Sequence, residues 1–170
     1  MSLAAALAAI ALLGFAAWRD VATRTIPDGV SIALAGIGLV ARALHGLEAA
    51  AWSLGAALLL GLLLALLHAR GWLGGGDVKL ATALAVGLDP LDTWAMVVAT
   101  ALAGGALALV YLILQRLLPA PRGSIRRDNR SLPARLLSAE AWRIRRRGPL
   151  PYGVAIAAGG TLIIMQSIAS

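Results

Sequence analysis

Long apolar runs separated by short polar segments make up most of this chain. Six such runs lie at residues 3–18, 29–44, 49–69, 77–88, 93–115 and 150–168. A transmembrane helix needs about 20 mostly apolar residues, so the pattern predicts an all-α polytopic membrane protein with about six transmembrane helices. The run at 77–88 is the shortest and would reach only about 18 Å, less than the roughly 30 Å of hydrocarbon. It either extends past Asp89 and Pro90 or forms a short helix packed inside the bundle.

The composition agrees with this interpretation. Of the 170 residues, 60% are hydrophobic and 14% are charged, against roughly 25% charged in a soluble domain. Twelve of the 23 charged residues lie between positions 116 and 147. These values exclude an ordinary soluble enzyme, a disordered tail and a collagen-like repeat. We expect one membrane-embedded domain, residues 1–170, containing a long basic loop at 117–149.

The basic residues indicate how the chain is oriented in the membrane. Arg19, Arg24, Arg70 and Lys79 fall on the same predicted side as the ten arginines between 116 and 147, and Arg42 falls on the other. The positive-inside rule then places the 117–149 loop in the cytoplasm and both termini outside.

The excess positive charge of the chain does not predict a nucleic-acid partner. The +7 net charge arises largely from one loop between apolar runs, which membrane topology explains. Within that loop, residues 142–147 mix apolar and basic side chains. We expect them to contact anionic lipid headgroups of the inner leaflet, with docking of a substrate as the alternative.

Two carboxylates at the predicted cytoplasmic edge are candidates for chemistry. Asp20 follows the first apolar run, and Asp77 begins the fourth. Carboxylates are costly at such positions, so a functional role is the default hypothesis. Two simpler roles stay open, because Asp20 could pair with Arg24 as the chain leaves the membrane and Asp77 could cap a helix.

A pair of carboxylates offers a specific reaction. Two carboxylates in a partly dry site cannot both ionise easily. The charged member can activate water while the protonated member protonates a carbonyl or a leaving amine, which is peptide hydrolysis without a covalent intermediate. Nearby, Lys79 either lowers the pKa of a carboxylate or anchors its helix at the headgroups. The chain has no cysteine, and His45 and His68 belong to no recognisable ligand cluster, so we expect no metal and no cofactor.

Three segments carry a family resemblance. The sequence Gly74-Gly75-Gly76-Asp77 matches the Gly-x-Gly-Asp signature of membrane aspartic proteases, and Asp20 is followed by Ile26-Pro27-Asp28. Residues 150–157 are similar to the start of the last span in the same proteins. In order and spacing, the chain resembles the prepilin peptidases, the leader peptidases of type IV pilins.

The resemblance implies roles for particular residues. The catalytic pair of the family carries over to Asp20 and Asp77. Asp28 occupies a position where Asn also occurs in the family, so it is not expected to be catalytic or to need a partner. Supporting or substrate-binding roles fall on four further positions, Gly74, Gly76, Pro27 and Lys79.

The resemblance also implies a function. It is that of an aspartic endopeptidase of the bacterial inner membrane that cleaves the leader of type IV or Flp prepilins at the cytoplasmic face. Bifunctional members have an N-terminal segment with zinc-binding cysteines and also methylate the pilin. This chain starts at its first apolar run and has no cysteine, so we expect the short Flp/Tad form without methyltransferase activity. A small proton-coupled transporter and a non-catalytic secretion-system subunit remain the alternatives.

Overall fold

The computed structural model describes residues 2–117 and 150–169, and this part of the chain contains helices and no strand. The basic loop predicted at 117–149 lies outside the described residues except for Leu117. The helices in chain order are α1 (Leu3–Thr23), α2 (Asp28–Leu44), α3 (Leu47–Ala69), α4 (Gly75–Ala85), α5 (Pro90–Leu117) and α7 (Tyr152–Ala169). The all-helical fold class is confirmed for these residues.

Four helices, α1, α3, α5 and α7, are long and apolar enough to cross a membrane. The other two predicted spans are shorter, with 17 residues in α2 and 11 in α4. At about 1.5 Å per residue, α4 is only about 16 Å long and cannot cross the hydrocarbon layer. It packs against α2, α3 and α7, so it is the short helix inside the bundle that the sequence left as one of two possibilities.

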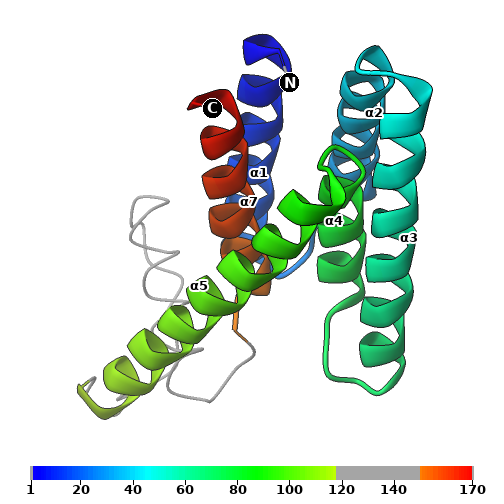
Figure 1. Cartoon of the computed structure of the whole chain (residues 1–170). Coiled ribbons are helices and arrows are strands. Elements are labelled where there is room, and N and C mark those ends of the chain that lie inside the picture. Colours follow the sequence, from blue (N-terminus) through cyan, green and yellow to red (C-terminus); the bar gives the residue numbers. More distant parts are fainter. Residues whose placement is uncertain (1, 118–149, 170) are drawn as a thin grey trace.

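The helices alternate in direction, so that the same end of the bundle collects several chain segments. Figure 1 shows both chain ends at one end of the molecule, together with the α2–α3 and α4–α5 connections. The opposite end holds the end of α1, the start of α2, the α3–α4 turn and the start of α7. Helices α1 and α7 form one side, α2 to α4 form the other, and α5 packs on α7 and contacts α3 (Figure 1).

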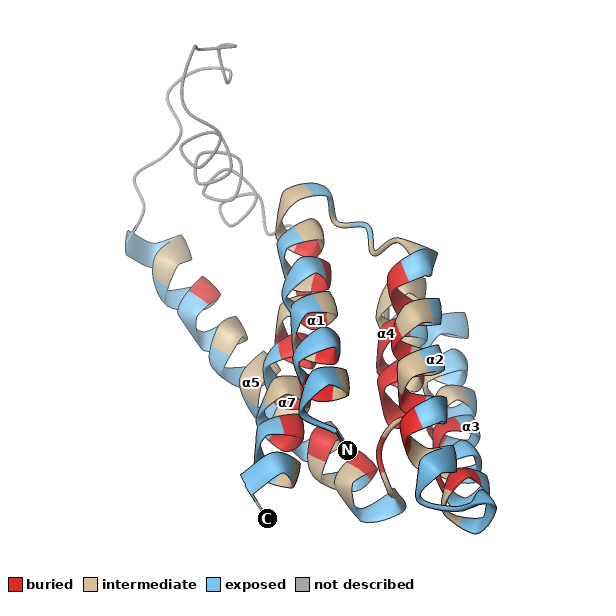
Figure 2. Cartoon of the chain, turned by 90° about the horizontal axis from the view of Figure 1, so that it is seen from above, coloured by how far each residue is buried: buried red, intermediate tan, exposed pale blue. Residues whose placement is uncertain are grey.

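Buried residues concentrate on α4 and on the sides of α1 and α7 that face other helices (Figure 2). On α1 the buried residues recur at helical spacing, and all but Asp20 are small or apolar: Ala6, Ala9, Leu13 and Ala16. Much of the outer surface of α3 is leucine, which suits contact with lipid. Because lipid is as apolar as leucine, packing of small residues must hold the helices together.

A close backbone contact joins α2 to the segment after α4. A methyl group added at Gly38 would lie 2.6 Å from the Cα atom of Gly87. Real Cβ atoms do not approach backbone this closely, so the two segments need glycine here to keep their spacing.

We therefore expect Gly38→Ala to destabilise the protein by about 1–3 kcal/mol, the usual cost of overpacking. Thermal unfolding in detergent, followed by circular dichroism, would measure this as a lower Tm. Gly36→Ala is the matched control, because a methyl group there meets nothing within 4 Å. Equal Tm values for the two variants would contradict the close contact.

Candidate active site

Asp20 lies inside the last turn of α1, because the helix extends to Thr23 rather than ending near residue 18 as the apolar run predicted. Arg24 ends the helix in a left-handed conformation with φ 56°. The backbone N–H of Arg24 donates to the carbonyl of Asp20 at 2.9 Å. Only 7% of Asp20 is exposed, so its carboxylate must find its partners within the protein.

One of these partners comes from the other end of the sequence. The backbone N–H of Gly153, in the first turn of α7, donates to Oδ2 of Asp20 at 2.8 Å. A methyl group at Gly153 would lie 2.9 Å from the same oxygen. The family resemblance identified the segment around Gly153 in the sequence but gave it no role. No residue pattern within that segment indicates a contact with Asp20.

Asp77 lies in the first turn of α4, three residues after the N-cap residue Gly74. The Asp77 carboxylate accepts a hydrogen bond from the backbone N–H of Gly74. In a capping box, the side chain at the third helical position accepts a hydrogen bond from the backbone N–H of the N-cap residue. Asp77 makes this interaction, so it stabilises the start of α4 from within the first turn, while Gly74 is the N-cap residue. A methyl group at Gly74 would lie 2.7 Å from Oδ2 of Asp77, so a larger residue at this position would force the Asp77 carboxylate to shift.

The two carboxylates interact electrostatically at this end of the bundle. Asp77 lies outside the four membrane-length helices. Its burial, followed by the negative charge of Asp20, raises its pKa to about 6, against the opposing effects of the Gly74 N–H and the positive charge of Arg24. Below about pH 6, a proton can therefore reside on Asp77 while a negative charge resides close by.

The segment between α1 and α2 connects the two candidate residues. Pro27 is the N-cap of α2 with extended backbone angles, and its carbonyl accepts from the N–H of Val30 at 3.0 Å. Just before it, Ile26 packs on Gly76, where an added methyl group would make an ordinary contact of 3.4 Å. The segment after Asp20 thus packs on the turn that carries Asp77.

Lys79 forms an ion pair with Asp28 at this end of the bundle. Its Nζ atom lies 2.8 Å from Oδ1 of Asp28, and both side chains are more than half exposed. The charged groups that shift the pKa of Asp77 are Asp20 and Arg24. Asp28 therefore has an ion-pair partner in Lys79, although an exposed ion pair contributes at most about 1 kcal/mol to stability.

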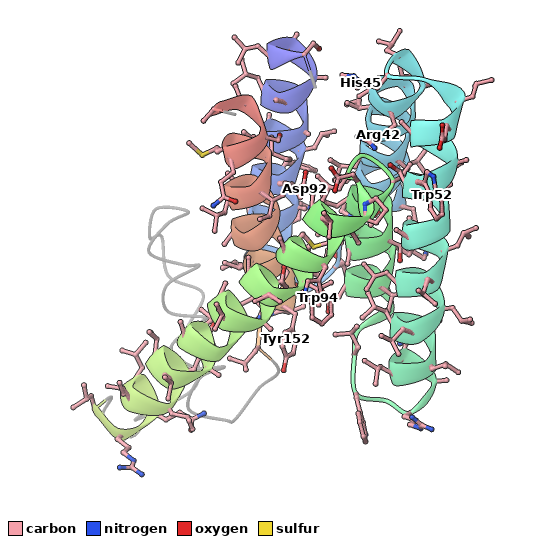
Figure 3. All side chains as sticks on the ribbon, viewed as in Figure 1. Arg42, His45, Trp52, Asp92, Trp94 and Tyr152 are labelled. Atoms are coloured by element: carbon pink, nitrogen blue, oxygen red, sulfur yellow. The ribbon has the colours of Figure 1, made fainter. Side chains whose placement is uncertain are left out.

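Neither histidine is a neighbour of the two carboxylates that shifts the pKa of Asp77. Nδ1 of His68 lies 2.8 Å from the carbonyl of Leu73 and so spans the turn that leads into α4. Figure 3 shows His45 and Arg42 at the opposite end of the bundle from Tyr152, the residue before Gly153. Among residues 2–117 and 150–169, no group of three or more histidine or acidic side chains is arranged to hold a metal ion.

Comparison with known proteins places this arrangement in a family. The model of the type IV leader peptidase family matches residues 7–113, which is more than half of the chain and includes both Asp20 and Asp77. No curated protein and no solved structure matches the chain. With four helices long and apolar enough to cross a membrane, this multi-pass chain belongs to the type IV leader peptidase family.

Proposed function

We propose that this protein is an aspartic endopeptidase that removes the leader peptide of type IV or Flp prepilins. In this proposal Asp20 and Asp77 are the catalytic pair, and the reaction takes place at the cytoplasmic face of the bacterial inner membrane. The observation that carries the proposal is the coupling of two carboxylates at one end of a helical bundle, one of them buried and the other with a pKa raised to about 6.

The chemistry follows from one shared proton. The ionised carboxylate removes a proton from water as the water oxygen attacks the scissile carbonyl carbon. The protonated carboxyl donates its proton to the carbonyl oxygen, and the resulting tetrahedral intermediate collapses with transfer of a proton to the leaving amine. Both products leave with the pair again holding one proton, so the scheme needs no metal and no nucleophilic side chain.

The position of the pair suits a substrate with a membrane-embedded helix. In the family, a prepilin has a short basic leader followed by a hydrophobic helix. The carboxylates lie at the end of the bundle that the basic residues Arg19, Arg24 and Arg70 also occupy. A peptide bond at the junction of leader and helix reaches this end when the helix lies in the membrane.

The basic loop fits a lipid-facing role better than a substrate-binding one. Its arginines would repel a basic leader, whereas each basic residue near an anionic leaflet gains about 1 kcal/mol. We therefore propose that residues 142–147, which lie outside the described part of the chain, contact lipid headgroups.

A transporter is the weaker alternative. Ion-coupling carboxylates in transporters lie near the middle of the bilayer, at discontinuous helices in matched halves. Here Asp20 is in the last turn of α1 and Asp77 is in the first turn of α4. Both therefore lie at one edge of the bundle.

We expect Asp20→Asn and Asp77→Asn each to abolish cleavage, with at least a hundredfold loss of rate, because an amide can neither take a proton from water nor donate one as an acid. Co-expression with a candidate prepilin would show unprocessed precursor on a gel, while membrane fractions confirm that the variants accumulate.

Asp28→Asn is the matched control, since it makes the same substitution on an exposed carboxylate paired with Lys79. It should keep near-wild-type cleavage. Full cleavage by either of the first two variants would contradict the proposed pair, as would loss of wild-type activity to a strong chelator followed by rescue with zinc.

The cleavage rate should depend on pH through the shared proton. The pKa of Asp77 is raised to about 6, so its proton is present below that pH and is lost above it. The rate should therefore fall by up to about tenfold per pH unit above the pKa, and fall again in acid as the second carboxylate is protonated. Initial rates of purified enzyme with a synthetic precursor, taken across this range, would test it. A rate that rises steadily into alkaline pH would contradict the scheme.

The orientation of the bundle can be tested with introduced cysteines, because the native chain has none. The positive-inside rule predicts that position 45 is outside and position 70 is cytoplasmic. An impermeant thiol reagent on spheroplasts should label His45→Cys and leave Arg70→Cys unlabelled until the membrane is opened. The reverse pattern would place the carboxylates on the wrong face for the proposed substrate.

A further inference from the structure

The contact between Asp20 and Gly153 has features that packing alone does not require. It joins residues 133 positions apart, is buried, and places a carboxylate oxygen 2.8 Å from a backbone nitrogen. Gly153 is the second residue of α7, where backbone N–H groups have no partner within the helix. The bond thus matches an unsatisfied donor with a buried acceptor.

The start of α7 also favours one charge state of this carboxylate. The first turn of a helix carries partial positive charge, and an ionised carboxylate makes stronger hydrogen bonds to backbone N–H groups there than a neutral one. Residues 152–155 contain no acidic side chain that would cancel this effect. The Gly153 N–H therefore stabilises Asp20 when Asp20 carries the negative charge.

We propose that Gly153 is a positioning residue whose N–H orients Asp20 and keeps it as the ionised, water-activating member of the pair, which leaves the proton to Asp77. This inference rests on the proposed function, and it assigns the two chemical roles within the pair.

The other charged groups around the pair are compatible with this assignment. Arg24 faces Asp77 and partly offsets its burial. Lys79 is bound to Asp28, and His68 is engaged by the carbonyl of Leu73. The remaining titratable groups on the segments packed nearby are Arg19 on α1 and the phenol of Tyr152 on α7.

The missing side chain of Gly153 matters as much as its N–H. An added methyl group would lie 2.9 Å from Oδ2, 3.0 Å from Cβ and 3.1 Å from Cγ of Asp20. These atoms belong to a short side chain on a helix, so the carboxylate as a whole must turn away. Gly153→Ala therefore lengthens or breaks the N–H bond without introducing a charge.

The test compares pH–rate profiles for precursor cleavage by purified protein. For Gly153→Ala we expect the acidic limb of kcat to move upward by about one pH unit, since one hydrogen bond to a charged group is lost. KM should change little, because Gly153 acts through Asp20 and not on the substrate. Gly14→Ala, on the same helix as Asp20 and with nothing within 4 Å of the added methyl group, should keep the wild-type profile.

A uniform fall in rate with an unmoved acidic limb would overturn the proposal and leave Gly153 with a packing role only.

A second measurement needs neither cleavage nor a stable Gly153 variant. Infrared titration of the protonated-carboxyl band would follow the one remaining carboxylate in each of two variants. Asp20 in the Asp77→Asn variant should stay ionised to a lower pH than Asp77 in the Asp20→Asn variant. The reverse order would overturn the assignment. If the wild-type protein cleaves no precursor, the proposed function fails, while the infrared order still tests which of the two carboxylates stays ionised to lower pH.

Discussion

Placing carboxylates at the edge of an apolar bundle is the constraint on which the rest of this structure depends. A buried carboxylate loses its hydration, and only hydrogen bonds from the protein can offset that cost. Here backbone N–H groups at helix starts supply them, Gly153 of α7 for Asp20 and Gly74 for Asp77. Helix starts are suitable donors because their first N–H groups have no partner within the helix. The bundle must therefore direct the start of α7 toward the end of α1.

The short helix α4 makes this arrangement possible. A helix that crossed the whole membrane would place its first turn at the surface, in contact with water. With only 11 residues, α4 is enclosed by α2, α3 and α7, and its first turn carries Asp77 in a half-buried position. The same enclosure explains why its buried residues are small or apolar on several sides, whereas those of α3 occupy one narrow face.

Glycine serves two different purposes in this chain. At Gly38 and Gly87 the absence of side chains lets two backbones approach, which is how helices associate where lipid offers no hydrophobic driving force. At Gly74 and Gly153 it lets a carboxylate reach a backbone N–H. The segment between α1 and α2 also contacts a glycine. Ile26 packs on Gly76 and so brings the end of α1 to the start of α4.

The sequence by itself determined the helical membrane class, the limits of most helices and the two carboxylates, because apolar run length and the cost of charge near lipid are local properties of the chain. It also indicated that residues 77–88 were too short to span. Only the tertiary structure decided that α1 continues past its apolar run to bury Asp20, and that Lys79 pairs with Asp28. The contact of Asp20 with Gly153 was likewise invisible in the sequence, since the two residues are 133 positions apart. A backbone donor carries no signature in its own residue type, and only folding shows which acceptor it meets.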